Sequence, residues 1–157
     1  MVAREPGDRQ RALAAAVGTA SVAFHPEPET ILDELVISLP PQLIKSACQL
    51  ARDDPALAFD YLRCLSVVDL GEQLQVVYHL YSTVHRHKMV IKALLPVDRP
   101  TVASVTSVWP GADWHEREAY DLFGVNFEGH PHLKPLLLWE GFPGHPLLKS
   151  YPVSGPE

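Results

Sequence analysis

The densest group of ionisable side chains lies in "DWHEREAYDLFG", residues 113–124. Carboxylates this close in sequence are typical of a metal site, an acid/base pair, or a helix that binds another protein. An acid/base pair needs a substrate pocket or nucleophile beside it, and the sequence offers neither. A carboxylate metal site needs a second such motif or a His at ligand spacing, whereas His115 directly precedes Glu116. The pattern therefore favours a helix with a structural or binding role.

This segment carries signals for both ends of a helix. Asp113 followed three residues later by Glu116 fits the capping box, in which the two side chains satisfy the first N–H groups of a helix. We therefore expect the helix to begin at Trp114. Gly124 is expected to end it, because glycine readily adopts the left-handed conformation found after a last helical turn.

The charged side chains inside this helix are expected to interact with one another and with solvent. Arg117 and Asp121 are four residues apart, so they can pair along one helix face. Glu118 is expected to be solvated, since a run of charges usually marks an exposed face. Composition alone therefore favours a structural role for this helix over a catalytic one.

The last part of the chain, residues 125–157, is expected to be an extended, irregular tail that binds a partner. It contains two Gly-His-Pro motifs, at 129–131 and 144–146, which predict rigid turns because Gly permits positive φ and Pro fixes φ. Its prolines prevent a long helix or central strand, yet it is rich in Leu, Trp and Phe. So much apolar surface is expected to be covered partly by this domain and mainly by a partner protein.

The three histidines of this tail allow a second interpretation. His130, His132 and His145 could bind zinc, which usually takes four ligands in a structural site. No fourth ligand is evident, and a proline after two of the histidines limits their geometry. Turn and interface roles are therefore favoured over a metal site.

Composition excludes several classes of function. The chain has 157 residues and a net charge of −6, which argues against binding to nucleic-acid phosphates. Its two cysteines, Cys48 and Cys64, cannot supply the four ligands of an iron–sulfur cluster and are expected to be buried. The sequence has no dinucleotide-binding glycine loop, no apolar run of transmembrane length and no signal-peptide core. A cytosolic or membrane-peripheral protein without its own redox centre is expected.

Hydrophobic periodicity and turn residues predict the elements that position these motifs. We expect the following segments: helices at 9–17 and 42–53, a strand at 31–39, a helical turn leading into a strand over 56–71, strands at 73–82 and 88–96, and a short helix within 100–111. In the strand 73–82, Leu74, Val76, Tyr78 and Leu80 are expected to face the core. The predicted class is α/β (α+β), with a small mixed sheet covered by helices on one face and followed by the irregular tail. The predicted divisions are 1–29 (helix and linker), 30–124 (α/β domain) and 125–157 (tail).

The charged helix and the tail together carry a family resemblance. The stretch "EREAYDLFGVNFEGHPHLKPLL", residues 116–137, resembles the signature of the 30 kDa (C-type) subunit of bacterial NADH-quinone oxidoreductase, respiratory complex I. "VVYHLYS" and the final "GHPLLKSYP" are similar to the same family, although Leu148 and Ser150 stand where it usually has an Arg and an acid. Ten spaced positions match the signature: Glu116, Arg117, Glu118, Asp121, Leu122, Phe123, His130, Lys134, Leu136 and Leu137.

The resemblance implies a structural subunit on the hydrophilic arm of a proton-pumping complex, at the cytoplasmic side of the inner membrane. The implied partners are the large quinone-site subunit (D type) and the cluster-bearing subunits (B and I types), which would hold the NAD(H), FMN, iron–sulfur and quinone sites. A homologous subunit of a membrane-bound hydrogenase or of a ferredoxin- or F420-linked complex is an alternative, and a small His/carboxylate metalloprotein is another.

No catalytic, cofactor-binding or metal-binding residue is expected in the chain itself. Glu116, Arg117, Glu118 and Asp121 are expected to form an ion-pair network at a subunit interface. The full set of expected interface residues is Glu116, Arg117, Glu118, Asp121, Phe123, Gly129, His130, Pro131, Lys134, Gly144, His145 and Pro146.

Overall fold

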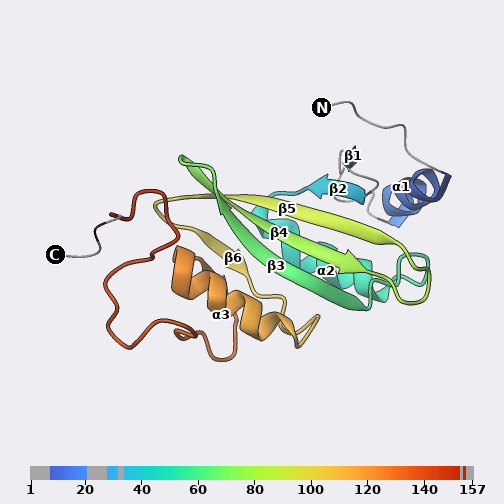
Figure 1. The fold of residues 1–157 in the computed structure, drawn as a ribbon. Coiled ribbons are helices and arrows are strands. Elements are labelled where there is room, and N and C mark those ends of the chain that lie inside the picture. Colours follow the sequence, from blue (N-terminus) through green and yellow to red (C-terminus); the bar gives the residue numbers. More distant parts are fainter. Residues whose placement is uncertain (1–7, 21–27, 32–33, 153, 155–157) are drawn as a thin grey trace.

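The computed structural model describes residues 8–20, 28–31, 34–152 and 154 (Figure 1). It contains three α-helices and seven strands in its described part. They are α1 (Asp8–Ala20), β1 (Pro28–Ile31), β2 (Glu34–Ser38), the 3-10 turn η1 (Pro41–Leu43), α2 (Ile44–Asp53), β3 (Tyr61–Asp69), β4 (Gln73–Tyr81), β5 (Lys88–Pro96), β6 (Thr101–Ala103), α3 (Ala112–Phe123) and β7 (Asn126–Glu128).

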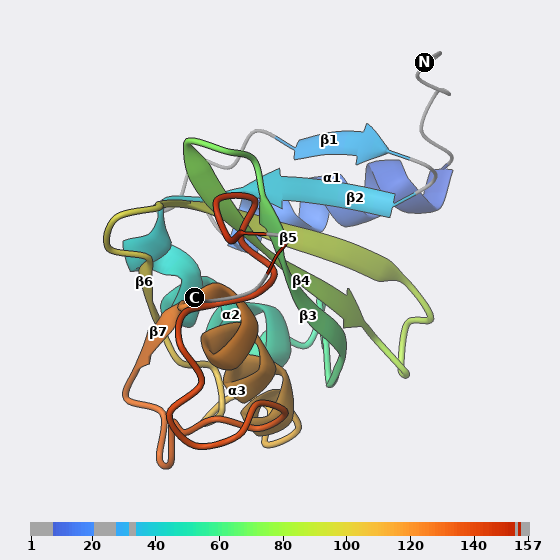
Figure 2. The same ribbon diagram turned by 60° about the vertical axis from the view of Figure 1, so that its left-hand side comes forward.

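The main sheet has five strands in the order β1-β2-β5-β4-β3. Strand β2 pairs with β5 in parallel, and the other neighbours pair antiparallel. This mixed sheet confirms the predicted fold class. The hairpin of β4 and β5 lies at its centre, and β3 forms the edge that lies beside α3 (Figures 1 and 2).

One face of the sheet packs against the helices and forms the core. The alternation predicted for β4 is confirmed, since Leu74, Val76, Tyr78 and Leu80 are all fully buried. Side chains of all three helices join the same cluster, among them Leu13 and Val17 of α1, Ile44 and Cys48 of α2, and Ala119 of α3. The helices therefore cover a single face, as expected for an α+β arrangement.

Two local predictions were wrong, and one strand was missed. Residues 100–111 contain no α-helix; instead β6 pairs in parallel with β7, because the β-branched Thr101 and Val102 lie extended beside Asn126 and Phe127. The strand expected at 31–39 is present as β2 (Glu34–Ser38), and it pairs with a preceding strand, β1, that was not predicted. Helix α1 continues past Gly18 to Ala20.

The chain after β7 has no further helix or strand among its described residues. We call residues 129–152 the strap. It consists of turns and irregular backbone and passes around α3 (Figures 1 and 2). Among the described residues, no helix combines the length and apolar character needed to cross a membrane.

Candidate functional site

Helix α3 starts earlier than its carboxylates predict. Its first residue is Ala112, after Gly111, and neither Asp113 nor Glu116 caps it. The turn that leads into the helix supplies backbone partners instead, since the Ala112 N–H bonds to the Trp109 carbonyl at 2.9 Å. The predicted capping box is therefore wrong, and both carboxylates are available for other contacts.

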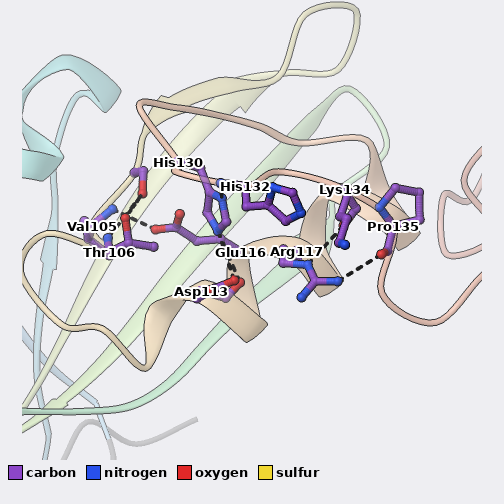
Figure 3. A network of polar contacts seen from close by, with 10 residues as sticks. Val105, Thr106, Asp113, Glu116, Arg117, His130, His132, Lys134 and Pro135 are labelled. Atoms are coloured by element: carbon purple, nitrogen blue, oxygen red, sulfur yellow. Dashed lines mark hydrogen bonds and ion pairs between the residues drawn. The ribbon is translucent and has the colours of Figure 1, made fainter.

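Glu116 is a buried carboxyl that fixes the loop before α3. Its side chain is fully buried, and its Oε1 accepts the N–H of Val105 at 2.7 Å (Figure 3). Its Oε2 has no hydrogen-bond partner among the described residues. Burial raises the pKa of Glu116 to about 7, and the nearby Ser104 side chain and the bond from Val105 only partly oppose that rise.

Arg117 binds the strap rather than a carboxylate of its own helix. Its Nε donates to the carbonyl of Lys134 at 3.2 Å, and a terminal nitrogen donates to the carbonyl of Pro135 at 3.1 Å (Figure 3). The guanidinium also lies 5.4 Å from the centre of the Trp114 ring, within the range of a cation–π contact. Its planar fork suits two neighbouring acceptors, which explains why the expected pair with Asp121 does not form.

Asp121 binds the next part of the strap through backbone groups. Its Oδ2 accepts the N–H groups of Leu136, Leu137 and Leu138 at 3.0, 2.7 and 2.9 Å. Burial alone would raise the pKa of Asp121, but these three donors outweigh it and hold the pKa below its ordinary value. Its charge is therefore used to hold the strap against α3.

The histidines of both Gly-His-Pro motifs contact α3. His130 has a buried ring whose Nε2 lies 3.4 Å from the Asp113 carboxylate, while its Nδ1 accepts the His132 N–H at 3.0 Å. His145 donates from Nδ1 to the carbonyl of Asp121 at 2.9 Å. The two motifs therefore fix the strap near both ends of α3.

The end of α3 brings a glycine against the second of these histidines. Gly124 has a φ of 75° and ends the helix, as predicted. A Cβ added at Gly124 would lie 2.7 Å from the ring of His145. Both the backbone conformation and the space therefore require glycine at this position.

Replacing Gly124 with alanine is expected to loosen the strap. Strain at positive φ should lower the free energy of unfolding by about 1–2 kcal/mol, and displacement of His145 should lower it by about 1–3 kcal/mol more. Urea unfolding measures the change. The matched control is Gly129→Ala, where φ is 79° but no atom lies within 4 Å of the added Cβ. Equal destabilisation by both variants would contradict the contact with His145.

The expected interface residues meet along α3 and the strap, but not as an ion-pair network. No ion pair joins Arg117 to Glu116, Glu118 or Asp121 in the part of the chain that the structure describes. Glu118 is exposed, as expected, and Phe123 packs partly buried against the core. Nor do the described residues contain a group of three potential metal ligands, so His130, His132 and His145 do not converge.

The strap is anchored to its own domain more extensively than expected. Near its end, the Leu147 N–H bonds to the Leu122 carbonyl at 3.1 Å, and the Lys149 N–H bonds to Asp69 Oδ2 at 2.7 Å. Leu133 and Leu148 are partly buried against the core, the latter at the position where the resemblance leads one to expect an Arg. A partner is therefore not needed to hold the backbone of the strap.

Large apolar side chains nevertheless remain exposed along α3 and the strap. The exposed fractions are 64% for Trp114, 63% for Leu137, 68% for Trp139 and 51% for Leu147. Sequence reasoning counted these residues as apolar but could not tell which would face outward. For Leu137, that distinction depends on Arg117 and Asp121, whose bonds fix the strap backbone over residues 134–138.

Comparison with known proteins relates this arrangement to one family. Residues 37–157 match the family described as "Respiratory-chain NADH dehydrogenase, 30 Kd subunit". The chain is 42% identical over 123 residues to the second form of the C-type subunit of NADH-quinone oxidoreductase of Rhizobium etli, covering 76% of the chain and 65% of that relative. It is 44% identical over 126 residues to the C-type subunit of Salinispora arenicola, covering 78% and 51%. The chain thus spans about half to two thirds of the length of these relatives.

Two solved structures share the fold. The trypsin-resistant fragment 1–134 of Nqo5 aligns with a TM-score of 0.65 and 28% identity, over 78% of this chain and 99% of the fragment. A chain of the archaeal membrane-bound sulfane sulfur reductase aligns with a TM-score of 0.72 and 19% identity, over 83% and 77% of the two chains. At 19% identity, the second likeness shows the fold alone.

Proposed function

The chain belongs to the family of the respiratory-chain NADH dehydrogenase 30 kDa subunit, and from this membership we propose that it is the C-type subunit of an NADH-quinone oxidoreductase. In this role it is a structural subunit of the hydrophilic arm and supports assembly and the quinone-reducing module. The identity of 42–44% to C-type subunits of such enzymes supports this assignment over a hydrogenase-type complex. The described residues hold no cluster of metal ligands that would favour the metalloprotein alternative.

The observation that carries this proposal is the apolar surface that the strap exposes while its backbone is fixed. Trp139 and Leu137 are about two thirds exposed, although Asp121 holds the backbone beside them. Exposed apolar side chains on an ordered backbone are typical of a protein interface, because little conformational entropy is lost when a partner covers them. Trp139 also contacts Phe142 edge to face, with ring centres 4.6 Å apart, which further restricts it.

We place the partners of this surface within the same complex. They are the large quinone-site subunit and the cluster-bearing subunits, and those chains hold the NAD(H), FMN, iron–sulfur and quinone sites. This chain contributes a rigid surface that fixes distances between them, and its contact with the membrane is indirect. It lies at the cytoplasmic side of the inner membrane as a peripheral subunit.

Replacing Trp139 with alanine is expected to weaken attachment of this subunit to the complex. Buried tryptophans at interfaces contribute about 2 kcal/mol or more, so retention should fall roughly 30-fold. The measurement is the amount of this chain that remains with quinone-reducing complex extracted from native membranes, after extended washing. Val84→Ala is the control, since Val84 is 69% exposed but lies between β4 and β5, away from the strap. Full retention and unchanged quinone reduction by Trp139→Ala would argue against the proposed surface.

A further inference from the structure

Strand β3 forms an open edge of the main sheet. It pairs with β4 on one side, and among the described residues no strand pairs with its other side. Alternate N–H and C=O groups along that side therefore lack a strand partner. Such edges tend to be blunted by bulges, charges or covering segments, and the segments left open can accept an added strand.

The two ends of β3 are blunted, while its middle is not. Its pairing register shifts between Leu62 and Cys64, which marks a bulge near the start of the strand. At the other end, Asp69 binds the backbone of Lys149, so the strap lies against that end. Residues 64–67 remain as a regular stretch between the two.

A hollow lies beside this regular stretch. It has a volume of about 230 Å³ and is lined by residues 64–67 of β3, by His115, Glu118, Ala119, Leu122 and Phe123 of α3, and by Leu147 of the strap. Helix α3 runs beside β3 and forms the opposite wall (Figure 1). An open strand edge facing a helix across a partly apolar hollow is the geometry in which peptide-binding domains add a strand.

We propose that the edge of β3 accepts an extended segment of another polypeptide, which pairs with residues 64–67 and places alternate side chains in the hollow against α3. This inference rests on the proposed role as a subunit and names one further mode of contact within it. The backbone groups of β3 supply the hydrogen bonds, and the wall of α3 selects the side chains.

The chemistry of the hollow describes the segment that fits. Ala119, Leu122 and Leu147 favour apolar side chains at alternate positions. Glu118 is exposed and is the one acidic residue of the lining, so a Lys or Arg on the segment would meet an opposite charge. A second copy of this chain fits poorly, because each copy carries a net charge of −6 and pairing two β3 edges would place both Glu118 side chains at one interface.

Amide hydrogen exchange tests the inference directly, because strand addition protects backbone N–H groups that a side-chain contact leaves free. The full chain is compared alone and within the complex purified from native membranes through a tag on this chain. Exchange of the open amides within residues 64–67 is expected to slow at least tenfold in the complex. Equal exchange in the two states, with the chain present in the complex, would overturn the inference and leave the proposed function standing.

Charge reversal supplies a second measurement. Glu118→Lys is expected to remove most of the protection at residues 64–67, while Glu128→Lys, the same change at an exposed residue of β7, should leave it intact. Loss of protection in both variants or in neither would contradict the assigned charge contact. A concentration-dependent dimer of the free chain with residues 64–67 protected would identify a second copy as the occupant and overturn the inference. Failure of the tagged chain to co-purify with any partner would refute the proposed function, and the inference with it.

Discussion

Replacing Asp121 with alanine is expected to free the central part of the strap from α3 while the sheet stays folded. The substitution removes the single oxygen that accepts the N–H groups of Leu136, Leu137 and Leu138. A hydrogen bond to a charged group contributes about 1.5–3 kcal/mol, and three that share one carboxylate are not additive. We expect a loss of about 3 kcal/mol for local opening, which corresponds to roughly hundredfold faster exchange.

Hydrogen exchange at the amides of residues 136–138 measures this effect in the full chain. Asp98→Ala is the matched control, because Asp98 is exposed in the loop after β5. Asp121→Asn is informative as well, since it keeps an acceptor oxygen but loses the charge and should give an intermediate rate. If the alanine variant exchanged as slowly as the parent chain, Asp121 would not be what anchors the strap. Release of the strap in Asp121→Ala should also leave its exposed apolar side chains without a fixed arrangement. The amount of this chain that remains with the complex should therefore fall.

The second large effect concerns the dependence of stability on pH. The ordinary pKa of a glutamate side chain is 4.5, whereas the pKa of Glu116 in the folded chain is about 7. The folded state therefore binds the proton more tightly than the unfolded state does. The contribution of Glu116 to the free energy of unfolding should therefore fall as pH rises from about 4.5 to 7, and the loss should be complete above that range. At 1.36 kcal/mol for each pH unit, the expected loss is about 3 kcal/mol.

Replacing Glu116 with glutamine should remove this dependence. The glutamine carbonyl can still accept the N–H of Val105, and the amide cannot ionise. The variant should match the parent at pH 5 and be more stable at pH 8 by up to about 3 kcal/mol. Urea unfolding at several pH values measures both, and Glu72→Gln is the control because Glu72 is exposed in the turn between β3 and β4. Because the pKa of Asp121 is below its ordinary value, the contribution of Asp121 to stability changes only at more acidic pH and does not oppose this trend. Equal slopes in the parent and Glu116→Gln would contradict the buried titration.

Much of the fold could be predicted because its signals are local. The alternation of β4 and the turn residues between β4 and β5 define the central hairpin without reference to the rest of the chain. The helical periodicity of α2 likewise depends on residues within a few positions of one another. These elements were predicted to within a few residues, and the sheet class follows from their order.

The errors arise where distant parts of the chain supply the partner. Thr101 and Val102 are strand residues because β7 lies beside them, and β7 follows only after α3. Arg117 and Asp121 fit a local pair, yet each binds backbone groups at least 15 residues further along the chain. Rules based on spacing compare side chains with near neighbours and do not account for such backbone partners. Glu116 was predicted to cap the helix for the same reason. Its actual partner, the N–H of Val105, lies 11 residues earlier in the chain.

The anchoring of the strap through main-chain atoms has a consequence for how this surface can diverge. Arg117 and Asp121 bind carbonyl and amide groups that almost every amino acid carries, so the identity of Leu137 or Trp139 is irrelevant to the attachment. Amino-acid substitutions at these outward positions can therefore change which partner is recognised, while the backbone of the strap keeps its place on α3. Only a proline at residues 136–138 is barred, because it would delete a donor that Asp121 requires.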